Sequence, residues 1–442
     1  MVRVSGPRAA AVAAALLRGK DGAAPSLRPW SVRWAQVWSP GPPPSRGLLD
    51  EALVLWMPGP NSYTQEDVLE LQCHAGPAAA RGVLDAVLAC GVRLADGGEF
   101  TLRAYLKGRL DLLQAEAVLD VVQARTEAAL RVHEGLLGGS LSREVQGWQE
   151  ALTGILALVE GHLDFPDDEV GEVDRDGFRA AVAGLAGALE AKLATFAWGR
   201  TSREGFAVAL AGAPNTGKSS LLNRLLEEDR AMVSPVPGTT RDTIEARLNA
   251  LGVSVRLIDT AGLRATSDPL EAEGVRRARA AAEDADLTVF VADGGRELED
   301  DEAEEAQRLG ARGRVLAVVN KGDLGHRPLD ALRRALGGEP LVVSARTGAG
   351  IGPLLEAIRQ AAWGGGRAAP DAAPLTHRRH RDAVERAAAA LRRGLDAWEQ
   401  GAFPEVAASE LHEAHRCLGE LLGWGTPDDV LEEIFSRFCI GK

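Results

Sequence analysis

Residues 212–219 read Gly-Ala-Pro-Asn-Thr-Gly-Lys-Ser, a G-x-x-x-x-G-K-S sequence, and they follow the apolar run Phe206–Ala211. Glycines let successive backbone N–H groups curl around a phosphate, while the lysine reaches the β and γ oxygens and the serine hydroxyl reaches Mg²⁺. A helix that begins near Ser219 directs the positive end of its dipole at the same anion. The octet therefore predicts a strand, a phosphate-binding loop and a helix that together bind a nucleoside triphosphate. The expected contacts are Asn215, Thr216, Gly217, Lys218, Ser219 and Ser220.

A second set of residues predicts the base. The apolar run Val315–Val319 leads into Asn320-Lys321-Gly322-Asp323, and the run Leu341–Val343 leads into Ser344-Ala345-Arg346. A carboxylate at Asp323 can accept from the N1–H and the exocyclic amine of guanine, whereas adenine has a lone pair at N1 and would leave that acceptor unpaired. We therefore predict GTP rather than ATP. The expected base contacts are Asn320, Lys321, Asp323, Ser344, Ala345 and Arg346.

Two further segments lie between these sets. The run Val253–Ile258 leads into Asp259-Thr260-Ala261-Gly262, where Asp259 would hold Mg²⁺ through water and the Gly262 N–H would sense the γ-phosphate. In the segment Gly238-Thr239-Thr240-Arg241-Asp242, the Thr240 hydroxyl is the best candidate for a second Mg²⁺ ligand beside Ser219. Each segment alone is compatible with an ordinary strand-to-turn junction. Their order and spacing together predict a GTPase domain.

Hydrolysis must follow another route than in Ras-like GTPases, because Leu263 stands where those proteins have a glutamine that orients the attacking water. Arg264 and Glu271 are the nearest polar candidates for catalysis. The transition state also gathers negative charge that an arginine or a cation must offset. The amide oxygen of Asn215 can help to coordinate a monovalent cation; the alternative is that Asn215 only shapes the loop.

Composition limits the remaining possibilities. A chain of 442 residues, 45% of them hydrophobic, has room for two or three domains with real cores. Its net charge of −13 argues against binding nucleic acid by bulk electrostatics, so any RNA contact is local or shared with a partner. We expect no membrane-spanning segment, because no uninterrupted apolar run of about 18 residues occurs. Cysteines without a C-x-x-C pair favour a reduced compartment.

Hydrophobic periodicity divides the chain into domains. Short strand-like runs and Pro-Gly loops over residues 30–107 indicate a small α+β domain, and helical spacing follows it. Helical spacing resumes after the nucleotide-binding segments. The economical interpretation is a P-loop domain, with a mostly parallel sheet and flanking helices, inserted in a discontinuous helical domain; separate domains are the alternative. The predicted boundaries are 1–108 for the α+β domain, 109–203 and 375–442 for the helical halves, 204–364 for the P-loop domain and 365–374 for a linker.

The first twenty residues admit two interpretations. They carry arginines, a lysine and many alanines, with no acid before Asp21, a composition that an organellar transit peptide shares. The alternative is a folded strand and helix of the N-terminal domain.

The carboxyl end of the chain carries its most specific resemblance. The sequence Phe438-Cys439-Ile440-Gly441-Lys442 is similar to the F-C-[IV]-G-K ending of the MnmE (TrmE) family, the tRNA uridine 5-carboxymethylaminomethyl modification GTPases. The segments Pro58–Thr64, Gly98–Thr101 and Asp164-Phe165 also match the family, and the resemblance covers nearly the whole chain. It favours the folded interpretation of the first twenty residues.

The resemblance implies an N-terminal tetrahydrofolate-binding domain that dimerises, a discontinuous helical domain and an inserted G domain. It also implies K⁺-stimulated GTP hydrolysis by G domains that dimerise face to face. Glu271 lies where the family's catalytic glutamate orients the water, and Arg264 lies in the matching switch segment. The implied K⁺ ligands are Asn215, Ser234, Val236 and Thr239.

The implied reaction modifies uridine 34 of certain tRNAs with a one-carbon unit from 5,10-methylene- or 5-formyltetrahydrofolate, together with a FAD-dependent MnmG-type partner. The implied assembly is a homodimer that forms a heterotetramer with MnmG, in the cytoplasm of a bacterium or in a mitochondrion or plastid of a eukaryote. Cys439 is the family's C-terminal cysteine, and whether it is a reactive or a structural thiol is left open. The implied folate contacts are Arg3, Glu70, Arg109 and Lys442.

Several departures from the family pattern bear on the N-terminal domain. The family begins with a strand and a Gly-rich segment before Arg3–Pro7, so this sequence is N-terminally incomplete relative to the family, and dimerisation and folate binding are in question. Gln65 and Ala75 replace glycines, and Arg109 stands where lysine is commoner. The alternative function is a regulatory or ribosome-assembly GTPase of the Era or Der type. Such a protein would carry a basic RNA-binding domain after its G domain, and none is visible in the sequence.

Overall fold

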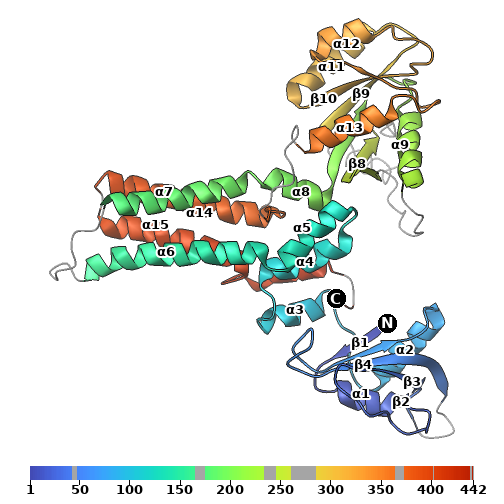
Figure 1. Ribbon diagram of the computed structural model, residues 1–442, viewed down its shortest axis with the longest axis vertical. Helices are drawn as coiled ribbons and strands as arrows, with labels where there is room; N and C mark the ends of the chain where they lie inside the picture. Colours follow the sequence, from blue (N-terminus) through green and yellow to red (C-terminus); the bar gives the residue numbers. More distant parts are fainter. Residues whose placement is uncertain are drawn as a thin grey trace. The chain divides into compact units, whose positions relative to one another are not determined.

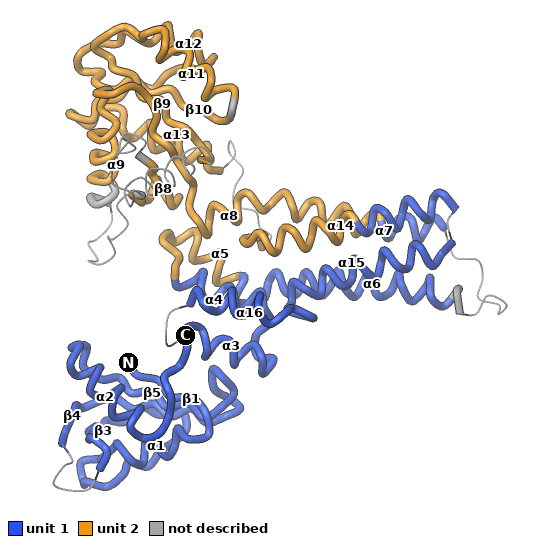
Figure 2. Tube along the Cα trace, turned by 180° about the vertical axis from the view of Figure 1, so that it is seen from behind, with its two compact units in different colours: residues 1–122, 136–182, 390–442 blue, residues 123–135, 183–389 orange. Residues whose placement is uncertain are grey.

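The computed structural model describes residues 1–41, 47–164, 175–232, 245–259, 285–363, 373–401, 403–438 and 441. These residues form two compact units, which Figure 2 shows in different colours. The first unit contains residues 1–122, 136–182 and 390–442, and the second contains residues 123–135 and 183–389.

The first unit begins with a five-stranded sheet in the order β1-β5-β4-β3-β2, whose neighbours are all antiparallel (Figure 1). Helices α1 (Ala9–Leu16) and α2 (Pro77–Ala89) pack on the face that carries Val4, Trp56 and Leu69. A strand and a helix therefore occupy the start of the chain, as the second interpretation of these residues predicted. The strands are β1 (Val2–Ser5), β2 (Leu17–Arg18), β3 (Val32–Trp38), β4 (Leu48–Met57) and β5 (Val68–Gln72).

Helices from both ends of the chain share a core in the first unit. Leu112 and Ala115 of α4 are buried against Phe435 and Phe438, which lie in and just after α16. Helices α6 and α15 run side by side. The helices that precede and follow the G domain thus pack together, which confirms the prediction of a discontinuous helical domain. Their bounds are α3 (Glu99–Leu106), α4 (Leu112–Gln123), α6 (Ser140–Asp164), α15 (Pro404–Leu422) and α16 (Asp428–Ser436).

The border between the units falls within four helices: at the last residue of α4, and inside α5 (Glu127–Leu137), α7 (Arg175–Leu193) and α14 (Arg378–Glu399). Helix α8 (Phe196–Glu204) then leads into the nucleotide-binding part of the second unit. The helical stretch Arg175–Glu204 is long enough to cross a membrane, and its best window has a mean hydropathy of 1.3. By its length and mean hydropathy the stretch could span a bilayer, although charged residues interrupt it. The core helix of a globular protein passes the same test, so a single such stretch is weak evidence for a membrane span.

The second unit contains a six-stranded sheet in the order β11-β10-β9-β6-β8-β7. Its paired strands are parallel except for β7, which runs antiparallel to β8. This confirms the predicted mostly parallel sheet. The strands are β6 (Phe206–Ala211), β7 (Glu245–Ala250), β8 (Val253–Asp259), β9 (Leu287–Asp293), β10 (Val315–Asn320) and β11 (Leu341–Val342).

Helices cover both faces of this sheet (Figure 1). On one face, Val208 is buried with Leu225 of α9 (Lys218–Met232) and Ile358 of α13 (Ile351–Ala362). On the other face, Phe290 is buried with Ala306 of α11 (Asp300–Arg312) and Leu332 of α12 (Leu329–Leu336). The strands β6, β9 and β10 are apolar on both faces because both faces of this part of the sheet are buried.

The parallel register brings the predicted nucleotide-binding segments to one edge. Asn320 at the end of β10 pairs with Asp293 at the end of β9, and Asp259 at the end of β8 pairs with Leu210 of β6. Open α/β sheets bind ligands outside the carboxyl ends of their strands. The loops that follow these strands therefore form the candidate site.

Candidate guanine-nucleotide site

The phosphate loop needs glycine at both of its glycine positions. A Cβ at Gly212 would lie 2.2 Å from the Val291 carbonyl oxygen, and one at Gly217 would lie 2.3 Å from the Asn320 amide nitrogen. Both residues also have positive φ, 130° and 90°. Asn215 has a φ of 65°, a left-handed conformation that asparagine tolerates better than most residues.

The loop residues bind the loop's own carbonyl groups. Lys218, which begins α9 and is 5% exposed, donates from Nζ to the carbonyl oxygens of Gly212 at 2.8 Å and Ala213 at 2.7 Å. The buried Thr216 hydroxyl donates to the same Ala213 carbonyl at 3.0 Å. Ser219 and Ser220 are exposed in the first turn of α9. This places a lysine ammonium, two hydroxyls and a helix N-terminus around the loop.

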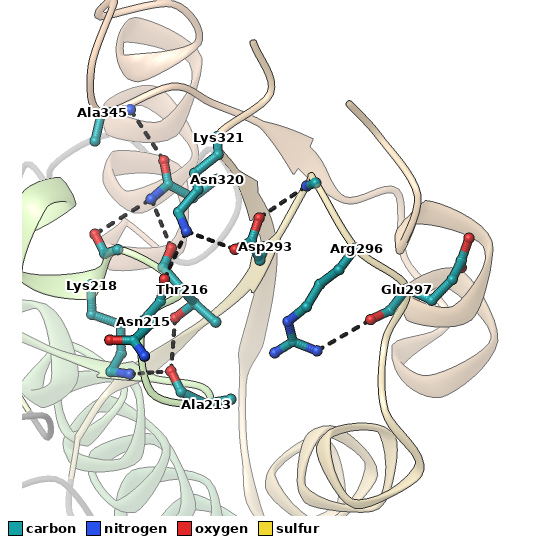
Figure 3. A network of polar contacts seen from close by, with 12 residues as sticks. Ala213, Asn215, Thr216, Lys218, Asp293, Arg296, Glu297, Asn320, Lys321 and Ala345 are labelled. Carbon is teal, nitrogen blue, oxygen red and sulfur yellow. Dashed lines mark hydrogen bonds and ion pairs between the residues drawn. The ribbon is translucent and has the colours of Figure 1, made fainter. Parts of the chain in front are cut away.

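Asn320 links the phosphate loop to the predicted base-binding loops (Figure 3). Its side chain is buried; the amide nitrogen donates to the Thr216 carbonyl at 2.9 Å, and the amide oxygen accepts from the Ala345 N–H at 3.1 Å. One side chain therefore holds three segments that are far apart in the sequence at a common edge.

Asp323 is held as a charged acceptor. Ser344 Oγ donates to one carboxylate oxygen at 2.6 Å, and Arg346 Nη2 donates to the other at 2.6 Å. The Ser344 hydrogen bond, together with the Arg346 charge, lowers the pKa of Asp323 below its usual value. The carboxylate is therefore ionised at neutral pH and can only accept hydrogen bonds, which matches the two donors on the edge of guanine.

Lys321 bridges two other segments of the site. Its Nζ donates to the Asn215 carbonyl at 2.8 Å and to Asp293 Oδ2 at 2.7 Å (Figure 3). Burial opposes the ionisation of Asp293, but the hydrogen bonds from Lys321 and the Gly295 N–H, together with the charges of Lys321 and Arg296, outweigh it, and the pKa of this carboxyl is lowered. Asp293 was not among the residues predicted from the sequence. The Asp-Gly-Gly that ends the apolar run Leu287–Ala292 is the signal that could have identified it.

A second polar site lies in the first unit, where Arg3 of β1 and Glu70 of β5 are register partners. Arg3 Nε donates to Glu70 Oε1 at 2.8 Å, and Arg3 Nη1 donates to the Gly441 carbonyl oxygen at 3.0 Å. The Arg3 guanidinium also lies 5.5 Å from the centre of the Phe100 ring. Two of the implied folate contacts are thus brought together beside the carboxyl-terminal Gly441.

Arg109, a third implied folate contact, lies near the same part of the unit. Its guanidinium stacks over the Tyr63 ring at 4.9 Å, and the Tyr63 hydroxyl is 2.9 Å from the hydroxyl of Thr101, the neighbour of Phe100. Arg109 Nη1 also donates to the Ser62 carbonyl at 3.1 Å.

Comparison with known proteins identifies the family. The model of the MnmE helical domain matches residues 112–439, and the model of the GTP-binding protein TrmE N-terminus matches residues 1–109. A protein of Geobacter metallireducens named tRNA modification GTPase MnmE is 44% identical over 446 residues, which cover 100% of this chain and 96% of that protein. The chain belongs to the MnmE family. Because MnmE proteins are GTPases, this chain is a GTPase as well.

Other members of the MnmE family are equally full-length matches. Proteins of Heliobacterium modesticaldum and Symbiobacterium thermophilum carry the same name and are 41% and 43% identical, each over 100% of this chain and 96% of the relative. The family match decides against an Era- or Der-type GTPase, which was the alternative from sequence.

Several residues predicted from the sequence motifs or from the MnmE family pattern lie outside the described residues. This part of the chain includes the switch segments, the candidate catalytic residues and most of the carboxyl-terminal motif, so their roles stay predictions. They are Ser234, Val236, Thr239, Thr240, Thr260, Ala261, Gly262, Arg264, Glu271, Cys439 and Lys442.

The described residues of this MnmE-family chain fit the predicted cations. The exposed Ser219 hydroxyl, beside Lys218, is a hard oxygen donor of the kind that Mg²⁺ prefers, and the backbone of Asp259 pairs with Leu210 of β6 at the end of β8. Asn215 is exposed, and its carbonyl is held by Lys321, so its position in the loop is fixed on one side.

Proposed function

We propose that this chain is the GTP-hydrolysing component of a complex that installs the 5-carboxymethylaminomethyl group, or a related group, on wobble uridine 34 of tRNA with a folate one-carbon unit. One observation carries the GTPase part of the proposal. The Asp323 carboxylate, ionised and held by Ser344 and Arg346, is joined through Asn320 to a complete phosphate loop.

Guanine recognition follows from the acceptor character of Asp323. Guanine offers N1–H and an exocyclic amine on one edge, and both can donate to the two oxygens of one carboxylate. Adenine offers no N1–H, so in an ATP-bound site the lone pair on its N1 would face the carboxylate where guanine places a donor. The site therefore selects GTP.

Phosphate binding follows from the loop. Lys218 can leave the Gly212 and Ala213 carbonyls for the β- and γ-phosphate oxygens, while the backbone N–H groups at the start of α9 face the same anion. Ser219, Asp259 and Thr240 would hold Mg²⁺, which supplies charge neutralisation between the phosphates.

Hydrolysis needs groups outside the described residues. We propose that Glu271 orients the attacking water and that Arg264 acts from the switch segment. Asn215, Ser234, Val236 and Thr239 would hold K⁺, which supplies the positive charge that an arginine finger provides in other GTPases. Face-to-face dimerisation of G domains would complete this arrangement.

Folate binding would use Arg3, Glu70, Arg109 and Lys442. A pterin offers an amino group and a ring N–H that a carboxylate can accept, and a folate tail offers carboxylates that arginines can bind. The contact of Arg3 with Gly441 supports this placement, because Arg3 also binds Glu70 and so brings Gly441, the neighbour of Lys442 in the sequence, toward this carboxylate. The folate, as its 5,10-methylene or 5-formyl form, supplies the one-carbon unit.

We propose that the partners are tRNA and a FAD-dependent MnmG-type protein, with this chain as a homodimer in a heterotetramer. The MnmE relatives of Geobacter metallireducens and Heliobacterium modesticaldum are bacterial proteins, which favours the cytoplasm of a bacterium over an organelle.

Two measurements test the proposal. GTP hydrolysis by the purified chain should be faster in K⁺ than in Na⁺, and equal rates in the two salts would exclude the cation role. Mass spectrometry of wobble uridines in tRNA from a deletion strain should detect the modified uridine when the strain carries this chain. The variant Lys218→Ala should not restore it, whereas Asp330→Ala, which removes an 84% exposed acid of the same domain, should restore it fully. Unrestored modification with the unaltered chain would contradict the tRNA-modifying function.

A further inference from the structure

The Asp293 carboxylate has no role in nucleotide binding or hydrolysis as described so far, yet it is a built part of the site. Its side chain is 16% exposed, Oδ1 accepts from the Gly295 N–H at 2.9 Å, and Oδ2 accepts from Lys321 Nζ at 2.7 Å. The backbone hydrogen bond fixes the carboxylate, so the position of Oδ2 is set independently of the lysine.

The turn after Asp293 packs against the base-binding loop without space for a side chain. A Cβ at Gly294 would lie 2.3 Å from the Gly325 carbonyl oxygen and 3.0 Å from that of Asn320. The Gly294 N–H donates to the Asn320 carbonyl at 2.7 Å. The carboxylate therefore sits on a turn that is rigidly attached to the loop bearing Lys321.

Lys321 joins the Asp293 carboxylate to the phosphate loop, because its ammonium group binds both. The lysine side chain is 34% exposed, so water competes for its ammonium group, and the carboxylate keeps the ammonium on the protein. The other acceptor is the Asn215 carbonyl at 2.8 Å. Lys321 itself has a φ of 59°, which aims its side chain back across the site.

Asn215 needs such a restraint. Its φ of 65° is a left-handed conformation that costs a non-glycine residue on the order of 1 kcal/mol, and the residue is exposed. A hydrogen bond from a charged donor to its carbonyl offsets that cost. When this bond is lost, the Asn215 peptide is free to relax and its side-chain amide moves with it.

We propose that Asp293 is a positioning residue that acts through Lys321 to hold Asn215 of the phosphate loop against the base-binding loop. The part of this inference that concerns the cation rests on the proposed K⁺ role of Asn215. The part that concerns nucleotide binding does not, because it depends only on how the two loops are joined.

The first test is nucleotide affinity in Na⁺ buffer, measured with fluorescent GDP on the full chain. Asp293→Ala should raise the Kd for GDP about tenfold, the effect of one hydrogen bond to a charged group. In the double variant with Lys321→Ala, the losses should not add, because both substitutions break the same link. Unchanged affinity in Asp293→Ala, or additive losses in the double variant, would overturn the proposal.

Matched variants separate positioning from general damage. Asp330→Ala removes a carboxylate that also pairs with a cation, Arg333 at 2.8 Å, and should leave the Kd unchanged. Asp293→Asn keeps the acceptor for the Gly295 N–H and should show a smaller loss than Asp293→Ala. A loss in Asp293→Asn as large as that in Asp293→Ala, with an equal melting temperature, would show that the charge alone matters and would contradict a graded positioning role.

The second test is a K⁺ titration of GTP hydrolysis. The K⁺ concentration for half-maximal rate should rise about fivefold in Asp293→Ala, while the rate at saturating K⁺ and GTP stays within about twofold. An unchanged K⁺ requirement would overturn the part that concerns Asn215. Absence of K⁺ stimulation in the unaltered chain would instead refute the proposed cation role and leave the GDP result as the decisive measurement.

Discussion

The nucleotide site and the Arg3–Glu70 site both hold a carboxylate with an arginine, but they are built in different ways. Asp323 is held by Ser344 and Arg346, which follow the neighbouring strand of a parallel sheet. Glu70 is held by a cross-strand register partner, and that partner also binds a carbonyl 438 residues away. The first site is assembled from loops at one sheet edge, whereas the second depends on antiparallel register and on the carboxyl-terminal segment.

Because the two sites are built differently, we expect side-chain substitutions in them to affect different properties of the protein. Side chains on the loops of the nucleotide site can be replaced with little effect on the sheet, so losses should appear in binding and turnover. Side chains in the Arg3–Glu70 site are part of the sheet and its neighbours, so losses should appear in stability as well.

The largest expected effect concerns Lys218. Lys218→Ala should lower kcat for GTP by about a hundredfold or more, because the site loses the charge that faces the developing negative charge on the phosphates. Phosphate release measures the rate, and the melting temperature without nucleotide should change little. A variant that turns over GTP near the original rate would show that the loop does not bind the phosphates as proposed.

The next effect concerns the base. Asp323→Asn replaces an acceptor with a group that also donates, so it should weaken GTP by about a hundredfold or more and favour xanthosine triphosphate, whose C2 oxygen accepts where guanine has an amine. Competition of both nucleotides against fluorescent GDP measures the preference. Retained preference for GTP would place the base elsewhere.

Arg3→Ala tests the second site, where we expect a loss of stability as well as of binding. It leaves the part-buried Glu70 carboxylate, 11% exposed, without its cation, which should cost about 1–3 kcal/mol of stability in the N-terminal sheet. Binding of 5-formyltetrahydrofolate should weaken, while GTP hydrolysis should stay within about twofold. Hydrogen exchange of β1 and β5 in the full chain measures the stability, with the exposed Arg81 of α2 replaced by alanine as the control. Equal exchange in both variants would break the contrast between the two regions.

The smallest expected effect is a pH dependence. Burial alone would raise the pKa of Glu99, but hydrogen bonds from Arg93 and Arg103 outweigh it and lower the pKa from 4.5 to about 2. The charged form therefore stabilises the fold above pH 4.5, and this contribution is lost as the pH falls from 4.5 through about 2. Because Arg93 is 64% exposed, the contribution is about 1–2 kcal/mol rather than the full value of the shift.

Glu99→Gln should remove this contribution. At pH 7 the segment Gly91–Leu106 of the variant should exchange hydrogen faster than in the original chain, and the two should converge as the pH approaches 2. The same comparison on Leu316–Asp323 should show no difference at any pH at which the chain remains folded. A constant difference across the range would mean that Glu99 acts through its size rather than its charge.

The placement of the phosphate loop and the two base-binding loops at one sheet edge could be predicted from sequence, because each of these loops is a short segment after an apolar strand. The phosphate loop, Asn320 and Asp323 lie where the parallel register requires them. Asp293 was missed because an Asp-Gly-Gly after an apolar run marks a turn at the sheet edge but does not show that the carboxylate contacts Lys321. Its role comes from tertiary contact.

The Arg3–Glu70 site could not be predicted from the hydrophobic periodicity of the sequence. The pairing of Arg3 with Glu70 depends on register over 67 residues, and only the family resemblance placed these residues together. Helical spacing over the first helical half, 109–203, also did not show the break between α7 and α8. There Thr195 Oγ1 donates to the Lys192 carbonyl and accepts the Leu375 N–H from a distant segment, a contact that hydrophobic spacing does not encode.

The two contacts of Arg3 also set an order of events on the ribosome. Its partner Glu70 emerges early, but Gly441 follows 438 residues after Arg3. At roughly 5–20 residues per second, that interval lasts roughly 20–90 s. During that interval the N-terminal sheet can be complete while the contact of Arg3 with Gly441 is not, so the surroundings of Arg3 would mature later than the sheet itself.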